Sequence, residues 1–186
     1  MHLAESGALP DRDLHRRFAS ALQALGGTRT ASEAEALLQV VSTSSDGSVD
    51  DSCAAWGLVY DEGDGPRALR GQVTSSTSDP IFSDEIEILP VLDFAELRFP
   101  SLRGSLVTVR SDNLGNCFRI NKAKCSPDSP CFLLLDRIFE LADLYDIELV
   151  ALWCPRAANS LLDSLASLRS DAAFDAWCRT AGVRRA

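Results

Sequence analysis

The sequence predicts an α/β domain built on a mixed five-stranded sheet, with three antiparallel strands followed by two parallel ones and with helices flanking the sheet. Three β-type runs separated by turn residues come first, and helical and strand patterns then alternate towards the C-terminus. A chain of 186 residues, 46% hydrophobic and 24% charged, suits one globular domain with a short appended segment. We expect this domain over residues 37–170, a helical lead-in or linker over 1–36, and a helical tail over 171–186.

The first part of the domain is predicted to be a three-stranded antiparallel meander. Three runs are apolar or rich in β-branched residues: residues 37–43, 54–60 and 68–74. A loop over 44–52 is expected between the first two strands, which places Asp46 at or just past the end of the first strand. The sequence Gly63-Asp64-Gly65-Pro66 predicts a turn between the second and third strands.

The second part alternates between helices and strands. A helix is predicted from Ser83, which has a residue type favoured at the N-cap, to about Phe99, although Pro90 removes one hydrogen bond and is expected to kink its first turns. The elements expected after it are a strand (105–110), a short helix (113–121), a long amphipathic helix (127–146), a strand (147–153), a helix (158–168) and a final helical turn or two (172–178).

Net charge and cysteine content limit the kinds of function that the sequence supports. A net charge of −9 argues against a broad basic surface for nucleic acid, and it predicts weak, salt-sensitive binding by this chain alone. Basic residues are nevertheless enriched locally, at Arg110, Arg119, Lys122 and Lys124. The six cysteines are scattered without a C-x-x-C pair, which predicts reduced thiols in an intracellular protein. No apolar run reaches the roughly 18 residues that span a bilayer, so no membrane partner is expected.

Four acidic residues occur near the ends of the predicted elements: Asp46, Glu87, Asp112 and Asp163. If the first and fourth strands are neighbours, Asp46 and Asp112 lie side by side. The two helical residues then reach the same edge of the sheet. Clustered carboxylates are the ligands that Mg²⁺ prefers, and their mutual repulsion is expected to raise at least one pKa and to destabilise the metal-free fold.

Each of these acidic residues also has an ordinary structural interpretation. Asp46 precedes a glycine, a pairing that is favoured in turns, and Asp163 suits a solvated helix face. Glu87 lies where the helix dipole favours acidic residues, and the adjacent Glu85 competes with it for any functional role. Asp112 is suited to cap the helix that follows it. The order and spacing of the four favour a shared site.

The motifs around these residues resemble those of ribonuclease H domains, especially those of retroelement reverse transcriptases. The motifs are Ser45–Ser48 (SDGS) followed by 54–60 (AAWGLVY), 86–92 (IEILPVL), 109–113 (VRSDN) and 153–166 (WCPRAANSLLDSLA). The resemblance implies a ribonuclease H-like fold in which Asp46, Glu87, Asp112 and Asp163 bind two Mg²⁺ ions, for which Mn²⁺ substitutes. It also implies cleavage of the RNA strand of an RNA–DNA hybrid, which is recognised by its shape and 2′-hydroxyls, and a reverse transcriptase domain as a neighbour.

Residues near the acidic cluster form the candidate substrate-binding set: Ser48, Asn113, Asn116, Arg119, Lys122 and Asn159. Many members of the family carry a histidine on a loop shortly before the last aspartate, whereas both histidines here, His2 and His15, are N-terminal. The basic protrusion of some cellular members also lacks a counterpart. Two alternatives therefore stand beside a catalytic domain: a non-catalytic ribonuclease H-like module beside a reverse transcriptase, and another nuclease of this fold, such as a transposase or exonuclease.

Overall fold

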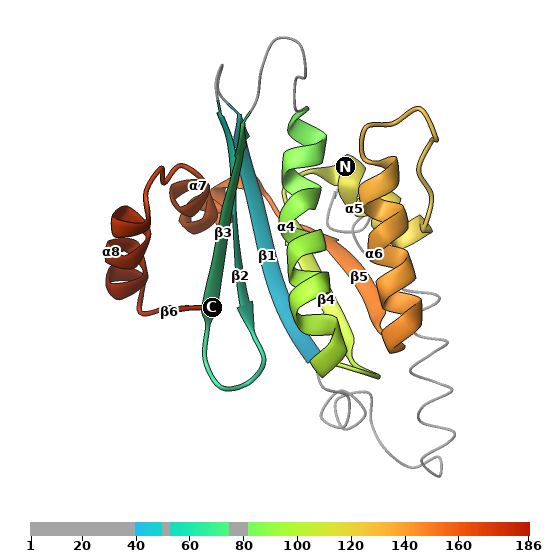
Figure 1. The fold of residues 1–186 in the computed structure, drawn as a ribbon, viewed down its shortest axis with the longest axis horizontal. Helices are drawn as coiled ribbons and strands as arrows, with labels where there is room; N and C mark the ends of the chain where they lie inside the picture. Colours follow the sequence, from blue (N-terminus) through green and yellow to red (C-terminus); the bar gives the residue numbers. More distant parts are fainter. Residues whose placement is uncertain (1–39, 50–52, 75–81) are drawn as a thin grey trace.

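A computed structural model describes residues 40–49, 53–74 and 82–186 of the chain, so the predicted lead-in over 1–36 lies outside the described residues. The strands are β1 (Val40–Val49), β2 (Cys53–Asp61), β3 (Arg67–Thr74), β4 (Leu106–Ser111), β5 (Glu148–Trp153) and β6 (Arg184–Arg185) (Figure 1). The helices are α4 (Ser83–Arg98), α5 (Leu114–Lys122), α6 (Phe132–Tyr145), α7 (Ser160–Ala166) and α8 (Asp171–Ala181), with 3₁₀ turns η1 (Phe99–Ser101) and η2 (Arg156–Ala158).

All of these strands belong to one sheet with the order β5-β4-β1-β2-β3-β6. Strands β1, β2 and β3 are antiparallel to one another, β4 joins β1 in parallel, and β5 joins β4 in parallel. The predicted mixed sheet of three antiparallel and two parallel strands is therefore confirmed. The two-residue β6, which pairs in parallel with β3, is an addition that the sequence did not predict.

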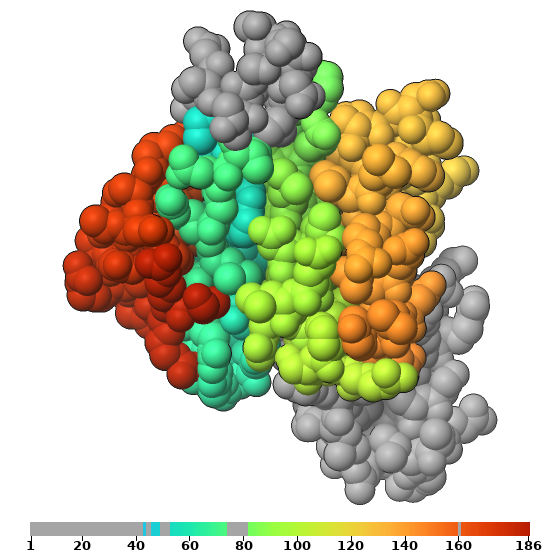
Figure 2. Space-filling model, viewed as in Figure 1, coloured from blue at the N-terminus to red at the C-terminus, as the bar shows by residue number. Residues whose placement is uncertain are grey.

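Helices cover both faces of the sheet (Figure 1). Helix α4 packs across β1 and β2 with α6 beside it, whereas α7 packs on the opposite face of the same two strands. The alternation along β2 follows this arrangement: Leu58 and Tyr60 belong to the core under α4, and Val59 between them packs against the core of α7 and α8. In Figure 2, α4 and α6 form one continuous surface, with the β2–β3 hairpin beside α4.

Strand β1 is longer than the sequence predicts. The segment expected to be a loop continues its pairing with β2 as far as Val49, which lies opposite Ala54. Asp46 is therefore inside β1, opposite Gly57, and not at the end of the strand. A run of serine, aspartate and glycine has low intrinsic strand preference, but pairing with β2 holds it in the sheet.

Two helix boundaries also differ from the prediction. The N-cap of α4 is Phe82 and not Ser83, and the Glu85 carboxylate accepts a hydrogen bond from the Phe82 backbone N–H at 2.9 Å. Pro90 lies inside an unbroken helix of 16 residues. Helix α6 begins at Phe132, because the prolines at 127 and 130 keep the preceding segment in turns.

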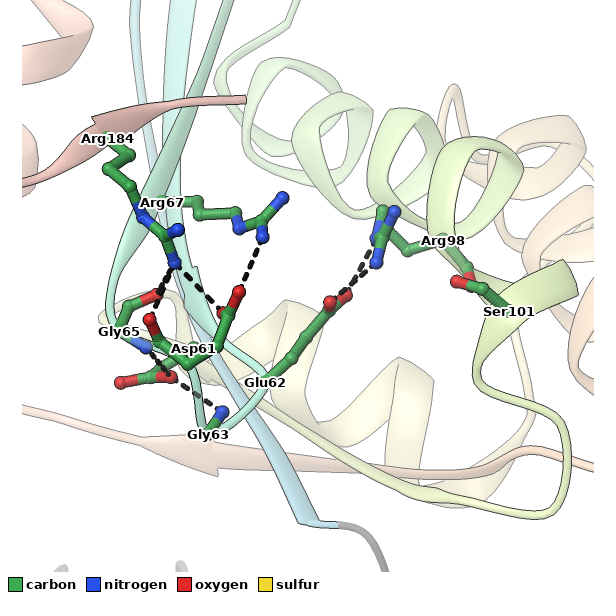
Figure 3. A network of polar contacts seen from close by, with 9 residues as sticks. Asp61, Glu62, Gly63, Gly65, Arg67, Arg98, Ser101 and Arg184 are labelled. Atoms are coloured by element: carbon green, nitrogen blue, oxygen red, sulfur yellow. Dashed lines mark hydrogen bonds and ion pairs between the residues drawn. The ribbon is translucent and has the colours of Figure 1, made fainter.

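The predicted turn between β2 and β3 is present and is fixed by charged side chains (Figure 3). The Asp61 carboxylate accepts hydrogen bonds from the backbone N–H groups of Gly63 and Gly65 at 2.7 and 3.2 Å. Both glycines have positive φ angles, 95° and 102°, which residues with a side chain rarely adopt. Arg184 of β6 donates to the Asp64 carbonyl oxygen at 2.6 Å, so the end of the chain is tied to this turn.

In the described part of the chain the six cysteines form no disulfide bonds, and three of them, Cys117, Cys131 and Cys178, are buried. Among the described residues, no helix combines the length and the apolar character that crossing a membrane requires.

Two glycines allow helices to approach the centre of the sheet from opposite faces. A Cβ at Gly57 would lie 2.5 Å from Cγ of Leu165 in α7. A Cβ at Gly47 would lie 2.7 Å from Cγ2 of Ile86 and 3.0 Å from the Ile86 carbonyl carbon in α4. Because heavy atoms do not pack this closely without strain, the absence of a side chain at both positions lets α4 and α7 lie against β1 and β2.

Replacing Gly57 by alanine should destabilise the protein, because the new methyl group meets Leu165 in a packed core. We expect Gly57→Ala to lower the free energy of unfolding by about 1–3 kcal/mol, measured by urea denaturation. In a Leu165→Ala background the same substitution should cost clearly less, because the two closest contacts, with Cγ and Cδ2 of Leu165, are removed. An equal cost in the two backgrounds would contradict the proposed contact.

Candidate metal centre

The pairing of β1 with β4 places two aspartates side by side. Ser44 of β1 lies opposite Arg110 of β4, and the strands are parallel. Two residues further along each strand, Asp46 is level with Asp112, which directly follows the last residue of β4. The indole N–H of Trp153 donates to the Asp112 carbonyl oxygen at 3.1 Å and so helps to fix the backbone there.

Helices on the two faces bring the other predicted acidic residues to the same place. One carboxylate oxygen from each of Asp46, Glu87 and Asp112 lies within 4.8 Å of the others. Asp163 of α7 joins this group because its carboxyl group hydrogen-bonds that of Asp46. The structure therefore brings the four predicted acidic residues together. Glu85, which the sequence left as a competitor of Glu87, instead bonds the backbone at the start of α4.

Burial of this negative charge perturbs the carboxyl groups. Asp46 is 4% exposed, and burial, its hydrogen bond with Asp163 and the charge of Asp112 raise its pKa to about 7. Burial and the charge of Asp112 also raise the pKa of Glu87 to about 7, although a hydrogen bond from Asn113 and the charge of Arg156 oppose this. Without a bound cation, both groups therefore hold protons well above the pH at which carboxyl groups ordinarily ionise.

The cluster fits a divalent cation. All of its donors are carboxylate oxygens, the hard ligands that Mg²⁺ and Mn²⁺ prefer. The Glu87 Oε2 atom is buried and has no hydrogen-bond partner among the described residues. An unsatisfied buried carboxylate oxygen is costly unless a cation binds it, so this atom is a natural ligand.

A single arginine that the sequence analysis did not single out lies beside the cluster. Arg156 lies in η2, just before α7, and its Nη2 atom is 3.7 Å from Oδ1 of Asp163. Its side chain is 79% exposed, so the guanidinium remains accessible to an anion from solvent. The sequence signal was weak, because only the fold shows that the turn before α7 lies next to the carboxylates.

Three of the predicted substrate-binding residues, Asn113, Asn116 and Arg119, form hydrogen bonds to Asp84 of α4. Asn116 is 1% exposed, and its amide donates to the Asp84 carbonyl oxygen at 3.0 Å. Its side chain is therefore part of the protein interior and is not accessible to a ligand. Asn113 is the N-cap of α5, and Arg119 forms an ion pair with Asp84 at 2.8 Å. Substrate contacts by Asn113 and Arg119 remain predictions, and any such contact competes with these bonds.

The other three candidates lie in β1, at the start of α7 and at the end of α5. Ser48 lies two residues beyond Asp46 in β1, and its hydroxyl donates to the Ala166 carbonyl oxygen at 3.1 Å. Asn159 is the N-cap residue of α7 and is 2% exposed. Lys122 is exposed at the far end of α5, about 12 Å along the helix axis from its first residue.

Solved structures of ribonuclease H proteins share this fold. RNase H1 from the halophilic archaeon Halobacterium salinarum NRC-1 matches with 22% sequence identity and a TM-score of 0.54, covering 74% of this chain and 98% of that one. LC11-RNase H1, solved in complex with an RNA/DNA hybrid, matches with 15% identity and a TM-score of 0.54, covering 67% and 92% of the two chains.

Prototype foamy virus protease-reverse transcriptase also matches, with 14% identity and a TM-score of 0.52; the match covers 70% of this chain and 21% of the viral protein. No protein-family model and no curated protein sequence matches the chain. At these identities the likeness shows the fold alone. The chain thus has the ribonuclease H fold, as its motifs predict, and its function has to be argued from the site.

The charge of Asp112 should make the metal-free protein less stable at neutral pH. Asp46 and Glu87 have pKa values of about 7 in the fold and ordinary values of 3.8 and 4.5. The folded state therefore retains protons that the unfolded chain releases, so their contribution to stability is full at low pH and falls as the pH rises towards about 7.

We expect Asp112→Asn to raise the free energy of unfolding in EDTA by on the order of 1 kcal/mol at about pH 8, and by less at about pH 5. Urea denaturation at the two pH values measures this difference. Asp136→Asn, at an exposed position of α6, is the matched control and should change little. If Asp112→Asn instead destabilises the metal-free protein at about pH 8, the four carboxylates are not clustered as described.

Proposed function

We propose that this chain is a metal-dependent endonuclease that hydrolyses the RNA strand of RNA–DNA hybrids. Its ligands for two Mg²⁺ ions, for which Mn²⁺ substitutes, are Asp46, Glu87, Asp112 and Asp163. The observation that carries the proposal is the convergence of three carboxylates within 4.8 Å from β1, α4 and the end of β4, on a ribonuclease H fold. The hydrogen bond between Asp163 and Asp46 supports the inclusion of the fourth.

The chain's own residues prepare the site for this chemistry. Two divalent ions held by these carboxylates would supply an activated water and would stabilise the charge of the leaving oxygen. Asp46 and Glu87 must lose their protons to act as ligands, so metal affinity should rise as the pH passes about 7. Arg156, exposed beside Asp163, is placed to attract the phosphodiester to this edge of the sheet.

The RNA–DNA hybrid is proposed as the substrate because of the fold and the acidic motifs together. A structural neighbour, LC11-RNase H1, was solved with an RNA/DNA hybrid, and the foamy virus neighbour is a protease-reverse transcriptase. We propose a reverse transcriptase domain as the partner and an intracellular location. With a net charge of −9, this chain alone should bind a hybrid weakly, and a neighbouring domain would then supply much of the affinity.

A second candidate function is a non-catalytic interaction module with the same fold. The acidic net charge favours it, and so does the position of both histidines, His2 and His15, far from the loop before α7 in sequence. Such a module has no need of carboxylates that bind a metal. Cleavage and metal binding therefore distinguish the two candidates.

The first test is cleavage of a labelled RNA–DNA hybrid in Mg²⁺ and in Mn²⁺. We expect the wild-type protein to cut the RNA strand and to leave double-stranded RNA and double-stranded DNA intact. Asp46→Asn should reduce the rate at least about 100-fold, because it removes a ligand and not merely a residue that supports one. Wild-type protein that cuts nothing in either metal, at low salt and high protein concentration, would favour the non-catalytic module.

Mn²⁺ should also stabilise the folded protein. At a concentration about 100 times its dissociation constant, binding to the folded state alone raises the free energy of unfolding by about 2.7 kcal/mol. Thermal denaturation with and without Mn²⁺ measures the effect, with NaCl of equal ionic strength as the control. We expect most of the gain to disappear in Asp46→Asn; a gain of the same size in that variant would place the metal elsewhere.

A further inference from the structure

The hydrogen bonds between α4 and α5 converge on Asp84, in the first turn of α4. Its carboxylate accepts from Asn113 Nδ2 at 3.0 Å and from Arg119 Nη1 at 2.8 Å. Its backbone carbonyl oxygen accepts from Asn116 Nδ2 at 3.0 Å. We refer to these four residues, Asp84, Asn113, Asn116 and Arg119, as the α4–α5 bracket. Asp84 thus bonds two of these residues through its carboxylate and the third through its backbone carbonyl group.

Further hydrogen bonds connect the bracket residues of α5 and its N-cap to one another. Asn113 Oδ1 accepts from the Asn116 backbone N–H at 3.0 Å, which caps the helix. Arg119 Nη1 also donates to Asn116 Oδ1 at 2.6 Å. At the other end of α5, the Asn121 side chain bonds both the N–H and the carbonyl oxygen of Ala151 in the edge strand β5, at 2.7 and 2.8 Å. Helix α5 is therefore fixed at both ends, and the bracket ties α4 to a rigid support.

Both sides of the bracket adjoin a carboxylate of the candidate metal centre. Asp84 precedes Glu87 by three residues, so the two side chains lie on the same face of α4, about one turn apart. Asn113 directly follows Asp112, and its side chain lies beside Glu87. The bracket consequently spans the two elements that supply Glu87 and Asp112.

These two carboxylates require a mechanical restraint. Their like charges repel each other, and Glu87 lies in the second turn of a helix whose N-cap, Phe82, has no side-chain acceptor. Glu85 bonds the Phe82 N–H at this end, but helix ends still fray more readily than helix interiors. The bonds from Asn113 and Arg119 to Asp84 resist both the repulsion and the opening of the helix end.

We propose that Asp84 is a positioning residue of the metal centre, which holds Glu87 and Asp112 at the separation at which both bind a divalent cation. This inference rests on the proposed metal-dependent nuclease function. Asp84 itself is not a ligand of the cluster. It acts through Asn113 and Arg119, so its loss should weaken metal binding without removing a ligand.

The test is Asp84→Asn, which preserves the shape of the side chain but leaves one of its two donors without an acceptor. We expect the Mg²⁺ concentration that gives half-maximal cleavage to rise about tenfold, with an unchanged KM for the hybrid and kcat restored at saturating Mg²⁺. Arg119→Gln, which removes the opposite end of the bracket, should shift the metal requirement in the same direction.

Glu96→Gln is the matched control. Glu96 is also a carboxylate of α4 paired with an arginine of a neighbouring helix, at 3.8 Å from Arg137, but it lies about 18 Å along the helix from Asp84. The Mg²⁺ concentration that gives half-maximal cleavage by Glu96→Gln should equal that of the wild type. A purely structural role for Asp84 would lower the melting temperature of Asp84→Asn and leave its metal requirement unchanged, and that result would overturn the inference.

Direct Mn²⁺ titration by calorimetry separates this inference from the proposed function. Mn²⁺ binding by the wild type that is about tenfold weaker in Asp84→Asn supports the positioning role, whether or not the protein cuts a hybrid. Equal affinities in the two proteins would overturn the positioning role alone. No Mn²⁺ binding by the wild type would overturn the proposed function and the inference together.

Discussion

The parallel pairing of β1 with β4 is the constraint on which the rest of the structure depends. It sets Asp46 level with Asp112, and it requires the chain to cross from one end of the sheet to the other between them. Helix α4 makes this crossing on one face of the sheet and delivers Glu87 to the edge where β4 ends. A shift of one residue in this register would reverse the faces of the β4 side chains relative to those of β1 and move Asp112 out of line with Asp46.

The same pairing concentrates charge that the fold cannot neutralise by itself. The raised pKa values of Asp46 and Glu87 show that ionising these buried groups is unfavourable. Packing elsewhere must offset this loss of stability. Two apolar cores on opposite faces of the sheet provide that packing, and glycines at positions 47 and 57 let the helices lie close to the strands. Stability and function therefore compete at this edge of the sheet, as they commonly do at metal sites.

Local sequence predicts much of this structure, because apolar periodicity and turn residues report directly on the strands and helices. It misses the full length of β1, where Ser44 to Ser48 have little strand preference and pairing with β2 holds them in the sheet. The grouping of Asp46, Glu87 and Asp112 was predictable from the motifs around them, although Asp46 lies inside β1 and not at its end. Asp84 was not predictable, because its partners in α5 are distant in sequence. Arg156 was not predictable either, because only the fold places the turn before α7 beside the other carboxylates. The burial of Asn116 follows from its bond to α4, which the local sequence does not reveal.

The two arginines near the cluster explain how the site remains open to an anion despite its charge. Arg119 forms an ion pair with Asp84. The positive charge of Arg119 offsets the negative charge of Asp84, which would otherwise raise the pKa of Glu87 further. Arg156 pairs with Asp163 only at 3.7 Å and stays largely exposed. One arginine thus reduces the repulsion within the protein, whereas the other faces solvent. A cation bound by the carboxylates would remove the remaining repulsion between them. The exposed Arg156 would then be the side chain that attracts an approaching phosphate.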